Sequence, residues 1–194
     1  MEYPLQLSFK LIALAPQIYV RDAAGQLRMY VKQKMLKLRE QVTVFADEAQ
    51  TVPLYHINAD RVIDFNARYN ISAPDGRPLG SVQRRGARSL WRANYEIMRE
   101  GQLILSIREA NPWAKVGDNL FGEIPILGMF AGYFFHPKYI VHRPDGTEVF
   151  HATKRPAMWE GLYEVQKRGA VAPEEEGLAV LSILMMLLLE RRRG

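Results

Sequence analysis

The sequence predicts a mainly β protein: a closed antiparallel β-barrel of about 11–12 strands that encloses a hydrophobic C-terminal α-helix. Two observations support this fold class. Many short runs of alternating or β-branched residues are separated by turn signals such as PDGR at 74–77 and PDGT at 144–147. A strongly apolar segment then follows near the carboxyl end, after Pro173. We expect one domain over residues 1–194, because no linker or low-complexity stretch divides the chain.

The apolar segment 178–189 is too short to span a bilayer. Ser182 is its only polar residue. A helix of this length rises about 18 Å, whereas the hydrocarbon core of a bilayer is about 30 Å thick. A helix that is apolar on every face must be surrounded, so we expect a central helix over 174–191 inside the barrel. A membrane tail anchor and a partner-binding helix are the two alternatives.

The strands are predicted from periodicity and from the turn signals between them. They are 17–22, 27–34, 41–46, 51–57, 66–73, 77–84, 90–98, 102–109, 137–143, 147–154 and 158–167. The alternation of Leu5, Leu7, Phe9 and Leu11 indicates a further strand. The apolar stretch 110–135 is interpreted as a packed excursion, with a short helix near 125–131.

One hairpin can be predicted residue by residue. If Arg99 to Gly101 form its loop, Tyr95 faces Leu105 and Ile97 faces Leu103. Odd-numbered residues of both strands then point inward, because side chains alternate along a strand. Even-numbered residues point outward, which sets Arg92 opposite Arg108. Two arginines in this position repel each other modestly, so an anionic group is expected beside them.

Composition limits the possible functions. Of the 194 residues, 48% are hydrophobic and 24% are charged, which is typical of a folded globular domain. The absence of cysteine excludes disulfides and thiol chemistry. It also agrees with the cytoplasmic location that we expect, with or without peripheral contact to a membrane. The net charge of +5 favours anionic partners.

A basic cluster is the best candidate site. It comprises Arg84, Arg85, Arg88 and Arg92, and Arg108 joins it through the predicted hairpin. Guanidinium groups suit phosphate because they donate two parallel hydrogen bonds. The alternative interpretation is a solvated strand face, which is common on surface strands and protects sheet edges. We apply that same interpretation to a second basic cluster, Lys32, Lys34, Lys37 and Arg39.

The sequence gives no sign of a catalytic or metal site. In the hairpin around 144–146 we expect Arg143 to pair with Thr147 and His151 with Tyr139. His142 and His151 would then lie on opposite faces and could not share a metal. No nucleophile elbow, P-loop or dinucleotide-binding glycine pattern occurs. We therefore expect no metal, no cofactor and no enzymatic activity.

Several segments resemble the LURP-one-related family, within the wider group of tubby C-terminal-like and phospholipid-scramblase-like proteins. They are YVKQK at 30–34, YNISAPDGRPLGSV at 69–82, RSLWRANYEI at 88–97, YIVHRPDGTEVFHA at 139–152 and the terminal apolar helix. The resemblance implies a barrel of roughly twelve strands with the last helix threaded through it, as in tubby-like domains. It also implies lipid contact, because tubby-like domains bind phosphoinositides through basic surface residues.

Together these arguments predict a non-enzymatic binding module. Its surface arginines and lysines would contact anionic phospholipid or phosphoinositide headgroups at a membrane surface, without crossing the membrane. The alternative is a cytosolic protein-interaction scaffold with no small-molecule ligand, which would use the 110–135 excursion as its contact surface. Nucleic acid is not an expected partner.

Overall fold

The computed structural model describes residues 1–10, 17–32, 41–61, 67–85, 93–110, 137–157 and 160–190. Within these ranges the chain forms twelve strands and one helix. The strands are β1 (Leu5–Lys10), β2 (Gln17–Arg21), β3 (Leu27–Lys32), β4 (Gln41–Phe45), β5 (Pro53–Ala59), β6 (Arg68–Ser72), β7 (Pro78–Arg84), β8 (Asn94–Arg99), β9 (Gln102–Glu109), β10 (Lys138–His142), β11 (Glu148–Arg155) and β12 (Glu160–Lys167). The helix is α2 (Pro173–Glu190).

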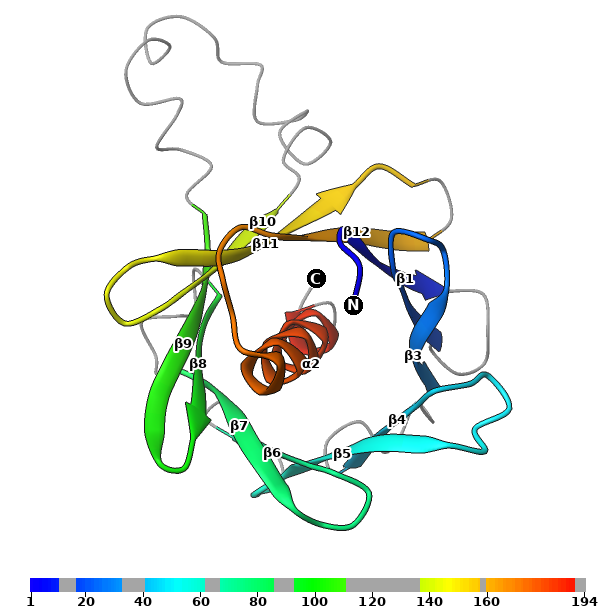
Figure 1. Ribbon diagram of the computed structural model, residues 1–194, viewed down its shortest axis with the longest axis horizontal. Helices are drawn as coiled ribbons and strands as arrows, with labels where there is room; N and C mark the ends of the chain where they lie inside the picture. The colour runs from blue at the N-terminus through cyan, green and yellow to red at the C-terminus, as the bar shows by residue number, and fades with distance from the viewer. Residues whose placement is uncertain are drawn as a thin grey trace, which may run out of the picture.

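The strands form a closed barrel in which consecutive strands are neighbours. Each strand pairs antiparallel with the next in sequence, and β1 closes the ring by pairing with β12. Figure 1 looks into this ring and shows α2 inside it. The predicted fold class is therefore confirmed, and the predicted helix over 174–191 agrees with α2 to within one residue at each end.

The apolar helix is covered by the protein's own sheet. From Leu178 to Leu188 every residue of α2 is buried. The single hydroxyl in this stretch is satisfied locally, because Ser182 Oγ donates to the Leu178 carbonyl oxygen at 2.8 Å. In the part of the chain that the structure describes, no helix is both long and apolar enough to cross a membrane.

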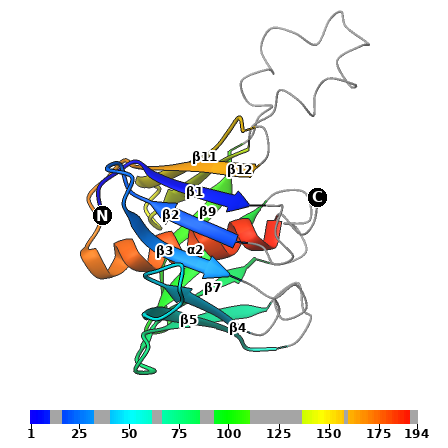
Figure 2. The ribbon, with the colours of Figure 1, turned by 90° about the vertical axis from the view of Figure 1, so that its right-hand side faces the viewer.

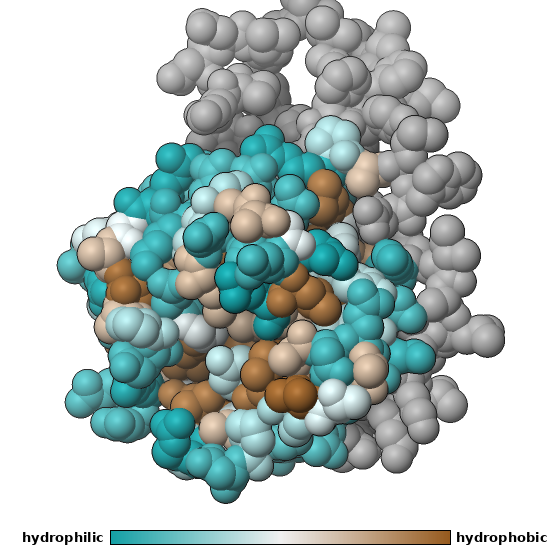
Figure 3. All heavy atoms as spheres, turned by 45° about the vertical axis from the view of Figure 1, so that its right-hand side comes forward, coloured by the Kyte–Doolittle hydropathy of each residue, from teal (hydrophilic) through white to brown (hydrophobic). Residues whose placement is uncertain are grey.

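The barrel wall alternates between an apolar inner face and a more polar outer face. On β1, for example, Leu5, Leu7 and Phe9 are buried, while Gln6 and Lys10 are exposed. The inner residues of the strands and the side chains of α2 form one hydrophobic core. On the face drawn in Figure 3 the described residues are mostly hydrophilic, with hydrophobic residues within a hollow.

The two open ends of the barrel differ, and we call them the front mouth and the back mouth. At the front mouth, which faces the viewer in Figure 1, α2 begins at Pro173; at the back mouth it ends at Glu190. Five short hairpin turns lie at the front mouth, because antiparallel order brings every second connection to the same end. Four of these turns place a glycine at positive φ, and in three of them the glycines are Gly25, Gly76 and Gly146, at 77°, 86° and 91°. Each of the three closes a three-residue loop of the kind that the turn signals predicted.

The β8–β9 hairpin corrects one predicted register. Its turn is formed by Glu100 and Gly101, both at positive φ, so Arg99 pairs with Gln102. A bulge beside Met98 then shifts the register, and Tyr95 faces Ile107 instead of Leu105. The turn and the bulge each shift the pairing by one residue, and a total shift of two residues leaves every side chain on its original face. Four residues therefore point inward as predicted: Tyr95, Ile97, Leu105 and Ile107. Leu103 lies between the turn and the bulge and is 37% exposed, so its predicted inward position was wrong.

The predicted excursion could not be compared with the structure. Residues 111–136 lie outside the described residues, and so does the short helix expected near 125–131.

We predict that Leu184→Asp prevents folding. Leu184 is fully buried between α2 and the barrel wall, and an unpaired charge there has no compensating partner. The measurement is the yield of soluble protein together with its circular dichroism spectrum. Leu103→Asp is the matched control, because Leu103 is 37% exposed and its replacement should leave the fold intact. A folded, soluble Leu184→Asp variant would contradict the central position of α2.

Candidate functional site

The structure divides the predicted basic cluster. Arg85 follows the end of β7 and Arg108 lies near the end of β9, so both are at the back mouth, and both are exposed. Arg85 Nη1 lies 3.3 Å from Glu96 Oε1. Arg88 and Arg92, together with Trp91, lie outside the described residues. The corrected register places Asn94 opposite Arg108, instead of the predicted Arg92, which lies two residues earlier in the chain.

Arg84 points into the barrel, so the prediction that it faces outward was wrong. It shares the inner face of β7 with Val82 and is only 8% exposed. Its Nη2 atom lies 3.7 Å from Glu190 Oε1, and its guanidinium carbon lies 5.9 Å from the centre of the Tyr95 ring. This arginine therefore closes the back mouth from within and is not presented to solvent as the neighbouring Arg85 is.

Glu190 is the centre of an inward polar cluster that sequence reasoning missed. The Tyr95 hydroxyl donates a hydrogen bond of 2.6 Å to Glu190 Oε1, the same oxygen that faces Arg84. An acidic residue at a helix C-terminus is electrostatically unfavourable. Its partners Arg84 and Tyr95 offset that cost and fix the end of α2 to β7 and β8. Two features of the sequence could have indicated this cluster: the predicted inward position of Tyr95 and the acidic residue at the end of the apolar run.

The inner wall around Glu190 is rich in tyrosine. Burial, followed by the nearby charge of Glu190 and its hydrogen bond, raises the pKa of Tyr95 above its usual value. Burial, followed by the neighbouring Tyr163 and Glu109, also raises the pKa of Tyr139. Both phenols therefore stay protonated at neutral pH, and the Tyr95 hydroxyl remains the donor to the Glu190 carboxylate.

A second set of charges anchors α2 at the front mouth. Glu176 Oε2 lies 2.5 Å from Lys167 Nζ, and its other oxygen lies 3.7 Å from the amino group of Met1. Glu175 Oε2 lies 3.1 Å from Arg143 Nη2. Acids in the first turn also suit the helix dipole. Two of the three glutamates at 174–176 are therefore used to hold the helix in the barrel.

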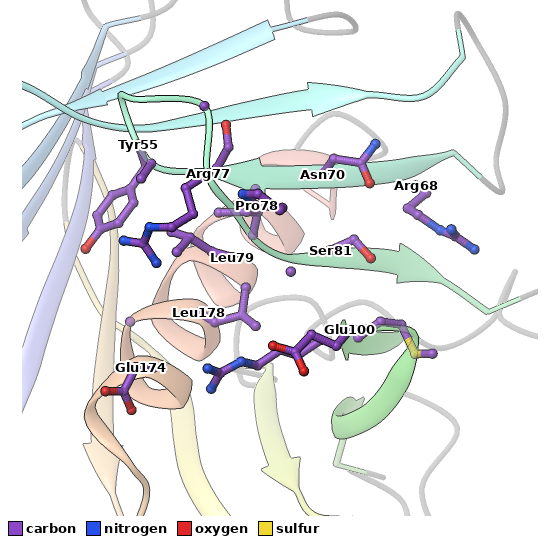
Figure 4. A pocket seen from close by; sticks show the side chains of 18 of the residues that line it. Tyr55, Arg68, Asn70, Arg77, Pro78, Leu79, Ser81, Glu100, Glu174 and Leu178 are labelled. Carbon is purple, nitrogen blue, oxygen red and sulfur yellow. The ribbon is translucent and has the colours of Figure 1, made fainter.

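A groove opens beside this anchor, and Figure 4 shows its lining. Its volume is about 1010 Å³. The β6–β7 hairpin forms one side, the β8–β9 turn forms the other, and the first turns of α2 lie between them. The charged residues of the lining are Arg68, Arg77, Arg99, Glu100 and Glu174. Sequence reasoning did not find this groove, because it depends on how far two hairpins diverge.

The histidine prediction is also corrected. Arg143 pairs with Thr147 as expected, since Arg143 N donates to the Thr147 carbonyl oxygen at 2.9 Å. A bulge beside His142 then places His151 opposite Ile140 instead of Tyr139. His142 and His151 consequently share the outer face. His151 Nε2 lies 2.7 Å from Glu148 Oε2. Among the residues with described positions, no group of three His, Asp or Glu side chains could hold a metal ion.

The structure describes only one residue of the second basic cluster. Lys32 ends β3 at the back mouth and is exposed, whereas Lys34, Lys37 and Arg39 lie outside the described residues.

Comparisons with known proteins give a family for the chain. The model of the LURP-one-related family matches residues 27–123. An X-ray structure of a protein from Arabidopsis thaliana aligns over 94% of this chain and 90% of that one, with a TM-score of 0.46 and 12% sequence identity. Among curated proteins no match was found.

We predict that Tyr95→Phe lowers the free energy of unfolding by about 1.5–3 kcal/mol, the usual range for a hydrogen bond to a charged group. The measurement is chemical denaturation followed by circular dichroism. Tyr55→Phe is the control, because within the described structure the Tyr55 hydroxyl makes no hydrogen bond. In the Glu190→Gln background the cost of Tyr95→Phe should shrink, as a double-mutant cycle would show. Equal costs in both backgrounds would refute the contact.

We predict that the fold resists alkaline pH up to the ordinary pKa of tyrosine and then weakens. The folded-state pKa of Tyr95 is raised above the usual 10.0, so its stabilising contribution is complete below pH 10.0 and is lost as the pH rises further. Tyrosinate absorbance and circular dichroism should be recorded together during the titration. Tyr95→Phe should leave unchanged the number of tyrosines that ionise before unfolding. One fewer such tyrosine would mean that Tyr95 ionises in the folded protein.

Proposed function

This chain belongs to the LURP-one-related family, and we propose that it is a non-enzymatic binding module that contacts anionic phospholipid headgroups. It would act as a peripheral protein at a cytoplasmic membrane surface. The observation that carries the proposal is a set of outward cations on neighbouring strands at the back mouth: Arg85, Arg108 and Lys138. We call this set the back-mouth patch.

The patch is built by strand order. Antiparallel pairing brings the end of β7 beside the start of β8, the end of β9 and the start of β10. Arg108 lies between Asn94 on one side and Ile140 on the other, with neither partner acidic. Within the described structure neither Arg108 nor Lys138 has an ion pair, while Arg85 has only the exposed contact with Glu96. These cations are available to an anionic surface.

The chemistry of the patch suits phosphate. Guanidinium groups bind phosphate oxygens through paired hydrogen bonds, and lysine adds a point charge. Each such cation near an anionic bilayer contributes about 1 kcal/mol, so several are needed for stable contact. The proposal extends to Arg88 and Arg92, which belong to the connection between β7 and β8. Arg84 is left out of the patch, since its side chain is buried against Glu190.

A binding role fits the barrel better than catalysis does. The side chains of α2 and of the inner strand faces fill the barrel interior as one core. Ligands therefore meet this protein at its outer surface and its mouths, where headgroup contact takes place. The fold by itself does not specify an activity, so the surface charges carry the argument.

We predict that the protein co-sediments with phosphatidylcholine vesicles containing about 30 mol % phosphatidylserine and not with pure phosphatidylcholine vesicles. Binding should fall as salt is raised, because screening weakens contacts between exposed charges. Arg85→Glu/Arg108→Glu should weaken binding by about tenfold or more. The matched control, Arg77→Glu/Arg168→Glu, makes the same change in net charge at the front mouth and should bind nearly as the unmodified protein does.

The proposal fails if neutral and anionic vesicles are bound equally, or if salt has no effect. It also fails if both double variants lose binding to the same extent, since net charge alone would then explain the result.

A further inference from the structure

We propose that the groove at the front mouth binds a short extended segment of a partner protein that carries an acidic side chain beside an apolar one. The inference is independent of the membrane contact proposed above, because the groove shares no lining residue with the back-mouth patch. It rests on three properties of the groove among the described residues: a strand edge without a strand partner, arginines without an ion pair, and an apolar floor.

The groove forms because two hairpins diverge. β7 pairs with β8 from Ser81 to Arg84. The pairing ends at Ser81 on the side of the front mouth, although both strands continue toward that mouth. Pro78, Leu79 and Gly80 therefore have no strand partner on that side among the described residues. A free strand edge is the surface to which extended peptides add by backbone hydrogen bonding.

Gly80 fixes the point at which the strands separate. A Cβ atom added there would lie 2.6 Å from both a Leu178 methyl group and the Met98 carbonyl oxygen. Only glycine lets β7, β8 and α2 approach one another this closely. Beyond this contact point the wall opens, and Leu178 becomes part of the groove floor, as Figure 4 shows.

Two arginines face the groove from its two sides. Arg77 follows the β6–β7 turn and Arg99 ends β8, and neither is ion-paired with any residue in the described part of the chain. Figure 4 shows the Arg77 side chain directed toward the groove, above Leu79 and Leu178. A carboxylate that binds an arginine in this position would bring the side chain two positions along the extended peptide onto the apolar floor, because residues i and i+2 of a strand share a face. This geometry favours an acidic residue two positions from an apolar one.

The rest of the lining favours a peptide over a lipid. Asn70, Ser72 and Ser81 supply hydrogen-bonding groups for the amides of a peptide backbone along the groove. The lining follows β6 from Arg68 to Ser72, five residues long. At about 3.3 Å per residue this length is about 17 Å, which matches an extended peptide of similar length.

The experiment is selection of peptides from a random displayed library against the intact protein, followed by affinity measurement on the selected synthetic peptides by fluorescence anisotropy. We expect selected sequences to be enriched in Asp or Glu two positions from Leu, Ile, Val or Phe. Arg77→Glu/Arg99→Glu should weaken their binding about tenfold or more, because an attractive charge becomes repulsive at both sides. Glu174→Gln should strengthen it, because one repulsive charge is removed.

Controls separate this proposal from the membrane proposal. Arg85→Glu/Arg108→Glu should bind the peptides unchanged, and Arg77→Glu/Arg99→Glu should bind anionic vesicles unchanged. Arg77 is exposed and Arg99 is half-buried, so their replacement should leave the circular dichroism spectrum and thermal unfolding as they are.

Three outcomes overturn the proposal. The first is a selection that enriches no peptide above a protein-free surface, and the second is a set of peptides without acidic residues. The third is equal weakening by the two double variants, which would show net-charge attraction instead of a site. In the first case, loss of vesicle binding in Arg77→Glu/Arg99→Glu would assign the groove to lipid.

Discussion

The structure depends on the burial of one apolar helix inside the protein's own sheet. A barrel of twelve strands is too wide for its wall residues to fill alone, and α2 supplies the missing core. The helix in turn has no polar face to expose to water, so it needs the barrel on every side. Each part is unstable without the other, and the charged contacts of Glu175, Glu176 and Glu190 hold the two together at both mouths.

The fold could be predicted because its signals are local. Alternation along the strands, glycine-containing turns and the short apolar tail each act within a few residues, and together they imply a barrel around a helix. Register was harder to predict, because each bulge shifts pairing by one residue and leaves little trace in the sequence. The single shift at His142 places His151 on the same face as His142, contrary to the prediction. In the β8–β9 hairpin the bulge at Met98 adds to a shift at the turn, and the two together leave the predicted faces unchanged.

The candidate sites were less predictable than the fold. Arg84 and Arg85 are adjacent in the sequence and identical in chemistry, yet one lies inside against Glu190 and the other is exposed. Nothing in a run of arginines tells which member faces inward unless the strand's phase is known. The groove depends on a longer-range fact, the contact of Gly80 with Leu178 of a helix almost a hundred residues away in the sequence.

The order of elements has a consequence for biosynthesis. All twelve strands precede α2 in the chain, and the strand that closes the ring, β12, comes directly before it. During translation the ribosome therefore delivers a nearly complete sheet whose inner face has no filler, with many apolar side chains open to water. The native core forms only when α2 emerges, so the nascent chain passes through a long interval in which chaperones can act on it.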